Sequence, residues 1–230
     1  MNRRWALLAL LAAPGSGVRA GNSGPFTPTI DAQRSGQTLI AAALRGDLQA
    51  LRAALGAGAD LHWRDRQGRN AVLAATQRGH SGAALWLIAQ GADVNAQDEQ
   101  RDSAFLLAGA RGHTEIVRRA LAAGADLKLT NRYGGTALIP ACHYGHVETV
   151  RLLLGSGIDI DHVNDLGWTA LLEAVILGDG GPRYVEIVRL LIAHRAKLDL
   201  ADRQGLTPLA HAEQRGQGAV IALLRAAGAR

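Results

Sequence analysis

The sequence predicts an all-α protein made of small, tightly packed helices that recur as tandem repeats. Hydrophobic residues make up 48% of the 230 residues but aromatic residues only 4%, and the chain contains 28 glycines. A glycine that separates two apolar stretches recurs every 33 residues through most of the chain. This composition excludes a disordered chain, a collagen-like chain and a small disulfide-rich protein.

Residues 1–20 form the first element and are typical of a secretory signal peptide. Met1–Arg4 is positively charged, Trp5–Ala13 is a run of nine apolar residues, and small or modest side chains precede a cleavage point after Ala20. Nine residues are too few for a membrane anchor, which needs roughly 20. We therefore expect a periplasmic or secreted protein that has no contact with a membrane after cleavage.

The charge balance bears on both the export route and the partner. The adjacent Arg3 and Arg4 leave the twin-arginine route open beside the general secretory route. Cleavage removes Arg3, Arg4 and Arg19 and no acid, so the remaining 22 basic and 20 acidic residues give a net charge of +2 in place of +5. A duplex-binding domain usually carries a clustered basic surface, so this balance argues against nucleic acid as the partner.

After a flexible lead-in at residues 21–34, rich in Gly, Pro, Ser and Thr, the chain repeats one pattern. A second glycine follows the separating glycine after twelve residues in most units, and turn signatures from Asp or Asn to Gly open four units. The first series is Gly46, Gly79, Gly112, Gly145, Gly178 and Gly216; the second is Gly58, Gly91, Gly124, Gly157 and Gly228; the turns are Asp65–Gly68, Asn131–Gly134, Asn164–Gly167 and Asp202–Gly205.

This pattern resembles the ankyrin repeat, a β-turn followed by two helices in about 33 residues. The resemblance rests on Thr136-Ala-Leu, Gly145-His-Val-Glu-Thr-Val-Arg-Leu-Leu-Leu, Gly91-Ala-Asp-Val-Asn-Ala and Thr207-Pro-Leu. It implies an all-α ankyrin-repeat solenoid with about six helix-turn-helix repeats joined by β-hairpin-like turns, the first unit being a cap with a degenerate hairpin. The expected domain covers residues 35–230, with units near 35–64, 65–97, 98–130, 131–163, 164–201 and 202–230.

Each recurring residue type has a physical role in such a unit. A hydroxyl at the head of the first helix, as in Thr136, Thr169, Thr207 and Ser103, is expected to cap that helix. Alanine on the inner side of the first helix lets neighbouring units approach closely, and the separating glycine ends this helix in the left-handed conformation. Aliphatic residues of the second helix, such as Leu152–Leu154, are expected to fill the space between units.

The sequence departs from the family pattern in two ways. The histidine of the family's T-P-L-H word is replaced by an apolar residue in every unit. Five residues, Asp179–Arg183, are inserted between the helices of the fifth unit. An insertion in a solenoid maps to a loop on one face, and we interpret this one as a tolerated surface loop in preference to a binding device.

No constellation of residues predicts catalysis, so we expect no enzyme activity, no cofactor and no metal. The chain lacks a G-x-S-x-G elbow, a P-loop and an H-E-x-x-H motif. His80, His113 and His146 recur once per unit and are expected to serve the turn and the contact between units, because structural zinc needs four close ligands. Cys142 lies in an apolar stretch, which favours a small buried side chain over a reactive thiol.

The resemblance implies that function resides in a surface. Arrays of this family use the turn tips and the exposed side of the first helices as a concave face that holds another protein, and we expect a monomer. The predicted hot spot for binding consists of apolar and aromatic residues at positions where a stable monomer favours polar groups, namely Tyr133, Tyr144, Leu166 and Trp168. Packing of the rings between adjacent turns is the alternative. The predicted partner-binding residues are Arg66, Arg69, Arg78, Arg111, Arg132, Tyr133, His143, Tyr144, Leu166 and Trp168.

Three other functions are weighed against this one. Related exported bacterial repeats suggest a periplasmic accessory factor that supports or protects an exported enzyme, for example in peroxide defence. A hydrolase or metal site on the array would be revealed by metal analysis and a substrate screen. Nucleic-acid binding through the row Arg45, Arg78 and Arg111 would show a steeply salt-dependent affinity for duplexes.

Overall fold

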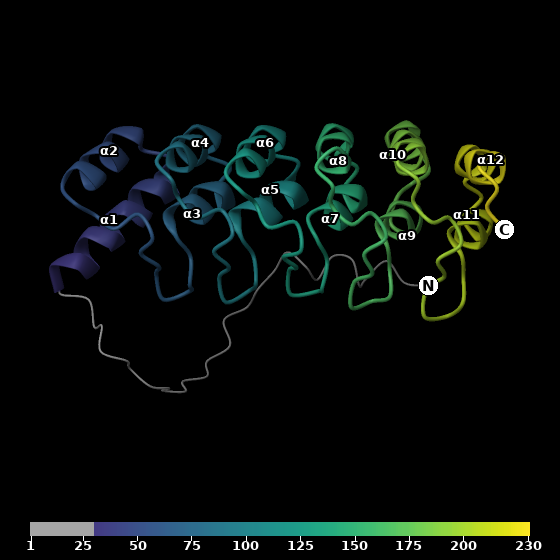
Figure 1. The fold of residues 1–230 in the computed structure, drawn as a ribbon, viewed down its shortest axis with the longest axis horizontal. Coiled ribbons are helices and arrows are strands. Elements are labelled where there is room, and N and C mark those ends of the chain that lie inside the picture. The colour runs from purple at the N-terminus through teal and green to yellow at the C-terminus, as the bar shows by residue number, and fades with distance from the viewer. Residues whose placement is uncertain (1–29) are drawn as a thin grey trace.

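A computed structural model describes residues 30–230, which fold into twelve helices arranged in pairs (Figure 1). The predicted signal peptide at residues 1–20 lies outside the described residues, as does the lead-in up to residue 29. The pairs are α1 (Ile30–Arg45) with α2 (Leu48–Gly56), α3 (Ala71–Gln77) with α4 (Ser81–Ala89), α5 (Ala104–Arg111) with α6 (Thr114–Ala122), α7 (Leu138–His143) with α8 (Val147–Leu154), α9 (Ala170–Ile176) with α10 (Pro182–Ala193), and α11 (Pro208–Gln214) with α12 (Gly218–Ala226).

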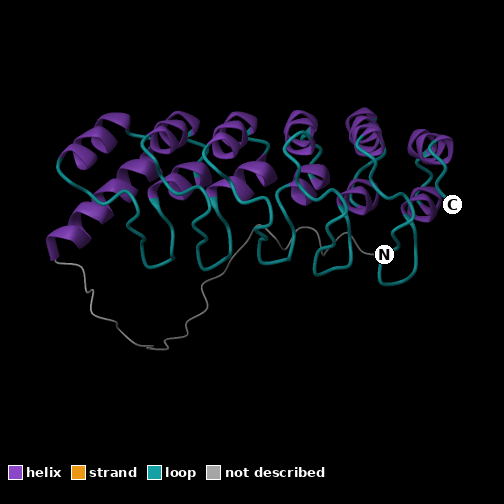
Figure 2. Ribbon diagram, in the orientation of Figure 1, coloured by secondary structure: helices purple, strands orange, loops and turns teal. Residues whose placement is uncertain are grey.

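The helices form two parallel layers. The first helices of the pairs, which carry odd numbers, stand in one row and the second helices in another, while long loops project from the first row on the side away from the second (Figures 1 and 2). Each first helix packs on its own partner and on the first helices of the neighbouring pairs. No strand occurs within residues 30–230, so the connections between pairs are hairpin-like loops. The prediction of an all-α solenoid of six helix pairs is confirmed.

Small side chains hold the first row together. Five alanines at equivalent positions of successive first helices are at most 1% exposed, which allows the helix axes to approach closely. The second helices add larger aliphatic residues, among which Leu153 is fully buried whereas the neighbouring Leu152 is only partly buried. Leu153 and Leu154, which is 8% exposed, are therefore the core residues of this segment. The alanines are Ala42, Ala75, Ala108, Ala141 and Ala174.

The loop between two pairs closes through one repeated arrangement. The Asp65 Oδ1 atom accepts hydrogen bonds from the backbone N–H groups of Gln67 (2.9 Å) and Arg69 (3.0 Å). The same arrangement occurs at Asp98, where the fourth residue is Arg101 with a φ of 59° in place of the usual glycine. The sequence signature missed this turn because it lacks the glycine. The remaining copies are built on Asn131, Asn164 and Asp202.

Side-chain caps open most first helices. Ser103, Thr169 and Thr207 accept a hydrogen bond from the backbone N–H three residues ahead, as predicted. Asn70 caps α3 in the same way. The predicted cap at Thr136 is wrong: α7 begins only at Leu138, and the Thr136 Oγ1 atom is buried without a hydrogen-bond partner within residues 30–230.

Side chains at the start of the second helices bind back to the preceding unit. His80 Nε2 lies 3.1 Å from the Leu44 carbonyl oxygen, and His146 Nε2 lies 3.2 Å from that of Ala110. Because a carbonyl oxygen only accepts, the imidazole donates in both bonds. These histidines join neighbouring units, as expected.

His113 occupies the equivalent position but does not make this bond. The carbonyl oxygen of Gln77, which corresponds to those of Leu44 and Ala110, accepts from Arg111 Nη1 at 2.5 Å. The Nε2 atom of His113 is consequently buried without a hydrogen-bond partner in the described chain, and burial together with the Arg111 charge lowers the pKa of this imidazole. One unit thus replaces the histidine link with an arginine link.

The insertion in the fifth unit is partly helical. Pro182 begins α10, which has twelve residues, whereas α8 has eight. Tyr184 takes the place of the linking histidine, and its hydroxyl donates to the His143 carbonyl oxygen at 2.8 Å. The left-handed residue at the end of α9 is Gly180, with a φ of 69°, and not Gly178 as predicted. The extra residues therefore lengthen a second helix by about one turn, which corrects the expectation of a plain surface loop.

The N-terminal end is closed by a long first helix. α1 has sixteen residues and begins at Ile30, so residues 30–34, which were predicted as flexible lead-in, are helical. The ring of Trp63 lies against Gly36, where a β-carbon would come within 2.3 Å of the indole. The first turns of α1 therefore lie beside the first hairpin at the end of the array. None of the described helices has the length and apolar character required to span a membrane.

Candidate functional site

We call the surface made by the hairpin loops and the exposed side of the first helices the first-helix face. All ten predicted partner-binding residues lie on it. The hairpins carry six of them, Arg66, Arg69, Arg132, Tyr133, Leu166 and Trp168, and the C-terminal ends of α3, α5 and α7 carry Arg78, Arg111, His143 and Tyr144.

Exposed apolar side chains gather on two adjacent hairpins of this face. Of the four large hydrophobic side chains exposed in the described chain, three are Tyr133 (41%), Val163 (50%) and Leu166 (49%). The two hairpins are joined by a hydrogen bond of 2.9 Å from the Asp165 N–H to the Tyr133 carbonyl oxygen. We call Tyr133, Val163 and Leu166 the apolar patch.

Val163 was missed by sequence reasoning, although a signal was present. The equivalent position holds Arg64, Gln97 and Thr130 in the three preceding units. An aliphatic residue at a position that is otherwise polar, on a turn, is a departure that the comparison of units could have shown.

Charged and aromatic groups border the apolar patch. The guanidinium of Arg132 lies 4.8 Å from the ring centroid of Tyr133, and its Nη1 atom donates to Gln100 Oε1 at 2.8 Å. Burial raises the pKa of Tyr144, the charges of Glu173 and Tyr133 raise it further, and Arg132 opposes them. Tyr144 is connected to the hairpin of Leu166 through contacts of His143, Glu173 and Asn164.

A buried carboxylate lies beneath the aromatic side chains. Glu173 is 5% exposed; its Oε1 atom accepts from Asn164 Nδ2 at 3.0 Å, and its Oε2 atom lies 3.3 Å from His143 Nδ1. The rings of His143 and Tyr144 are stacked with their centroids 4.2 Å apart. This cluster fixes the two rings at the base of the patch, and the sequence did not reveal it because the partners come from three different elements.

Trp168 and Tyr144 are half-buried, so packing accounts for part of their role. The indole Nε1 of Trp168 is buried and has no hydrogen-bond partner among residues 30–230. By contrast, Tyr133 and Leu166 are exposed at the tips, where packing does not explain them. The exposed residues are therefore the sharper probes of binding.

Arg69 is already engaged within the protein. Its guanidinium donates to Asp65 Oδ2 at 2.9 and 2.7 Å and to Gln77 Oε1 at 3.0 Å. Three of its five guanidinium N–H donors are thus engaged within the protein. Arg66 and Arg78, by contrast, are exposed.

A carboxyl group lies between two of the predicted arginines. Burial and the neighbouring Asp98 raise the pKa of Asp102 to about 6, against the opposing charges of Arg132 and Arg111. Hydrogen bonds connect the two arginines across adjacent units: Arg111 donates to the Gln77 carbonyl oxygen, the Gln77 amide donates to Asp98 Oδ2 at 3.3 Å, and Arg132 donates to Gln100 of the Asp98 hairpin.

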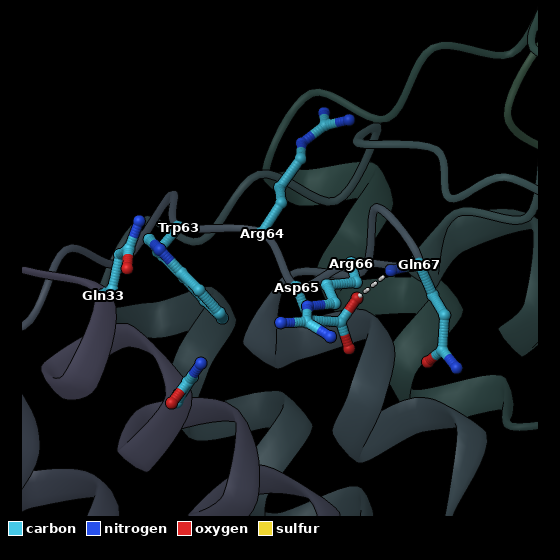
Figure 3. Close-up of a pocket in the computed structure, with 7 residues that line it drawn as sticks. Gln33, Trp63, Arg64, Asp65, Arg66 and Gln67 are labelled. Carbon is cyan, nitrogen blue, oxygen red and sulfur yellow. Dashed lines mark hydrogen bonds between the residues drawn. The ribbon is translucent and has the colours of Figure 1, made fainter. Parts of the chain in front are cut away.

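A separate groove of about 560 Å³ lies at the N-terminal end of the array (Figure 3). Gln33 and Gln37 of α1 line one side, and the first hairpin lines the other from Trp63 to Gln67. Five of the seven lining residues are glutamines or arginines, and Trp63 and Asp65 complete the wall.

The chemistry of the remaining polar groups is limited. Cys142 is fully buried, and burial together with Glu173 raises the pKa of its thiol, which keeps it protonated. His211 Nε2 lies 2.7 Å from Asp202 Oδ2 in a buried pair that joins α11 to its own hairpin. Within residues 30–230, no group of three His, Cys, Asp or Glu side chains is arranged to hold a metal ion.

Comparisons with known proteins agree with this architecture. The model of ankyrin repeats (3 copies) matches the chain in overlapping segments at residues 9–98, 38–131, 83–164, 105–183 and 159–230. A crystal structure of an ankyrin repeat domain from Acinetobacter baumannii AYE superposes with a TM-score of 0.81 and 50% identity, over 84% of this chain and 98% of that one. The ankyrin repeat protein EF0377 superposes with a TM-score of 0.79 and 38% identity, over 83% of this chain and 97% of that one.

The curated relative is similar over a shorter stretch. The ankyrin repeat protein YahD of Escherichia coli (strain K12) is 47% identical over 57 residues, which are 25% of this chain. The alignment spans 28% of the length of YahD.

Proposed function

This chain belongs to the ankyrin-repeat family, whose domains generally mediate protein–protein interaction, and we propose on that premise that it is a non-catalytic scaffold. Its partner is another protein, held on a concave face formed by the hairpins and the exposed side of the first helices. The centre of the binding surface is the apolar patch with Tyr144 and Trp168 at its base.

The observation that carries this proposal is the placement of the exposed apolar side chains. Three of the four in the described chain, Tyr133, Val163 and Leu166, lie together on two neighbouring hairpins. Clustered exposed apolar groups on a soluble protein mark sites of interaction, whereas scattered ones need no explanation. Arg132 beside Tyr133 adds the residue types that commonly anchor interfaces.

An affinity experiment tests the proposal. The chain from residue 21 onward, its Tyr133→Ala/Leu166→Ala variant and a Leu48→Ala variant are used as baits in a cell-envelope extract of the source organism. Leu48 is the matched control because it is the other exposed large hydrophobic residue, at 36%, and lies at the start of the second helix α2. We expect a discrete partner on the wild type and on Leu48→Ala that is lost on the double variant.

Equal capture by all three baits would contradict the proposal. The unfolding of the same variants separates binding from packing. Because Tyr133 and Leu166 are exposed, the double variant should lose less than about 1 kcal/mol, whereas Leu153→Ala in the core should lose about 2–5 kcal/mol. A loss as large as that of Leu153→Ala would identify the patch as packing.

The proposed place of action is the periplasm or the exterior of the cell. The support for it is the signal-peptide pattern of residues 1–20 in the sequence. Cell fractionation and N-terminal sequencing test it, with Gly21 as the expected first residue. A cytoplasmic protein that retains Met1 would contradict it.

The identity of the captured partner then decides a narrower role. An exported enzyme whose stability or activity falls when the scaffold is removed would establish an accessory factor, for example one that serves peroxide defence. An exported structural or receptor protein would exclude that role and leave the scaffold proposal in place.

A further inference from the structure

We infer that the segment of the partner that crosses the first three units is acidic and extended, with an apolar anchor that enters the apolar patch. This inference rests on the proposed function and specifies the chemistry of its partner.

The first observation is a row of arginines without acidic partners. Arg45, Arg78 and Arg111 occupy equivalent positions at the C-terminal ends of α1, α3 and α5, and all three side chains are exposed. The side chains of Arg45 and Arg78 form no hydrogen bond or ion pair with another described residue, and the guanidinium of Arg111 bonds only the Gln77 carbonyl oxygen. The guanidinium groups of Arg45 and Arg78 therefore face solvent without an acidic partner, and the nearby carboxyl of Asp102 acts on Arg111 without forming an ion pair with it.

Several arginines of the second helices have acidic partners, whereas Arg52 of α2 and Arg119 of α6 have none among the described residues. Arg118, Arg151 and Arg189 lie on α6, α8 and α10 and each contacts a glutamate at 2.5–3.7 Å, from Glu115, Glu148 or Glu186. Ion pairs thus recur along one layer of the array and are absent from the arginine row of the described first helices. A row of one sign that forms no ion pairs attracts a ligand of the opposite sign and steers its approach.

The row is continuous with the apolar patch. Arg111 donates to the Gln77 carbonyl oxygen, and the Gln77 side-chain amide donates to Asp98 Oδ2 at 3.3 Å. On the next hairpin, Arg132 donates to Gln100 Oε1 of the Asp98 hairpin at 2.8 Å and lies over Tyr133. A single chain can therefore contact the arginines of the first three units and reach the patch of the fourth and fifth units without leaving the first-helix face.

The spacing of the row specifies the spacing of the acids. Packed helices lie about 8–10 Å apart, and an extended chain advances about 3.3–3.6 Å per residue. Acidic residues about three positions apart therefore face successive arginines. The apolar anchor follows after a further three to six residues, roughly one or two units along the array.

Carboxylates on the same surface favour an acidic peptide over a nucleic acid. Glu99 and Asp165 are exposed at hairpin tips on either side of Arg132. A phosphate backbone carries charge at every nucleotide and would meet both, whereas a peptide can place an apolar or neutral residue beside them. The adjoining apolar patch also suits side chains more than phosphates.

Selection from random displayed peptides tests the inference. Peptides of about 16 residues, long enough to span roughly five units when extended, are selected on the chain from residue 21 onward. We expect enriched sequences with Asp or Glu about every third position followed by an aromatic or aliphatic residue. Synthetic copies are then measured by fluorescence anisotropy at about 50 and 200 mM salt, where affinity should fall with salt.

The variants assign the effect to the row. Arg45→Glu/Arg78→Glu should weaken the affinity for the selected acidic peptides about tenfold or more. Arg45→Gln/Arg78→Gln should weaken this affinity less, and it avoids placing an acid at a helix C-terminus. The matched control is Arg52→Glu/Arg119→Glu, the same charge change at exposed positions of α2 and α6, which should change affinity less than about twofold.

The outcomes separate this inference from the proposed function. Selected peptides that lack acids, or that bind the arginine variants unchanged, overturn the inference, and the proposed function stands if they still require Tyr133 and Leu166. Failure to select any peptide that depends on Tyr133 and Leu166 overturns both. Tighter binding of a DNA duplex than of the peptides, lost in the Arg45/Arg78 variants, overturns the inference in favour of nucleic acid.

Discussion

Asp102 is a carboxyl group that the fold holds in an unfavourable state at neutral pH. Its pKa is about 6 in place of 3.8, since burial and Asp98 outweigh the two arginines. The folded protein therefore binds a proton more tightly there than the unfolded chain does. The stability associated with that proton is complete below about pH 3.8 and is lost as the pH rises through about 6.

We predict that Asp102→Asn stabilises the protein at pH 7.5 but not at pH 4. Each unit of pKa corresponds to about 1.4 kcal/mol, so a gain on the order of 1–2 kcal/mol is expected at the higher pH after allowance for solvent screening. Urea unfolding of both proteins at several pH values between these limits measures it. An equal effect of the substitution at both pH values would show that ionisation of Asp102 is not the cause.

Gly36 and Gly82 are helical glycines with opposite surroundings. A β-carbon at Gly36 would lie 2.3 Å from the Trp63 ring, whereas one at Gly82 would meet nothing within 4 Å. We predict that Gly36→Ala destabilises the protein by about 1–3 kcal/mol and that Gly82→Ala stabilises it by up to about 1 kcal/mol. Thermal and urea unfolding measure both changes, and shifts in the same direction would refute the packing of Trp63 described above.

At the scale of the element, two threonines at equivalent positions differ in what their hydroxyls do. Thr169 caps α9 by accepting from the Leu172 N–H, whereas the hydroxyl of Thr136 makes no bond with the described chain. We predict that Thr169→Val costs about 1 kcal/mol and that Thr136→Val is neutral or stabilising, because it removes a buried unpaired hydroxyl. Comparison of their unfolding midpoints in urea, at unchanged slope, is the test; equal losses would contradict it.

The sequence predicted those elements that repeat and missed those that do not. A left-handed residue recurs at the same place in each unit, so the series that contains Gly46 and Gly79 marked the helix ends. Left-handed residues also recur at the hairpin turns and after the second helices, and the stack imposes the conformation there even where no glycine is present, as at Arg101 and Arg195, with φ values of 59° and 64°. The pattern of glycines in the sequence could not show that these two arginines adopt the left-handed conformation.

The sequence predicted where the candidate site lies but not the buried contacts beneath it. Tip residues such as Tyr133 and Leu166 follow from the register of the units. The contact of Glu173 with His143 and Asn164 joins a helix to the preceding unit and to its own hairpin. Its partners are 30 and 9 residues away with no counterpart of the same composition in other units, so spacing alone gave no indication of it.

At the scale of the whole molecule, the main contacts between helices of the described residues lie within a pair or between neighbouring pairs. α1 and α2 at one end and α11 and α12 at the other pack on a single neighbouring pair, whereas inner pairs pack on two. Local opening of a repeat array is therefore easiest at its ends.

We predict that amide hydrogen exchange is slowest in α5–α8 and faster in α2 and α12. Exchange measured by mass spectrometry on the chain from residue 21 onward tests this. The packing of Trp63 on Gly36 predicts in addition that Gly36→Ala accelerates exchange in α1 more than in α9. Uniform protection from end to end would show that the array unfolds as one cooperative unit.

The extra turn of α10 shows that the two layers need not keep the same length. Residues 179–183 are accommodated where the second row begins, while α9 still packs on α7 and α11 as its counterparts do. A longer insertion between α9 and α10 would therefore change the start of a second helix and leave the hairpins of the apolar patch as they are. We expect that a fluorophore or tether grafted between Asp179 and Pro182 would report on, or immobilise, the protein and leave the hairpin tips that carry the apolar patch unobstructed.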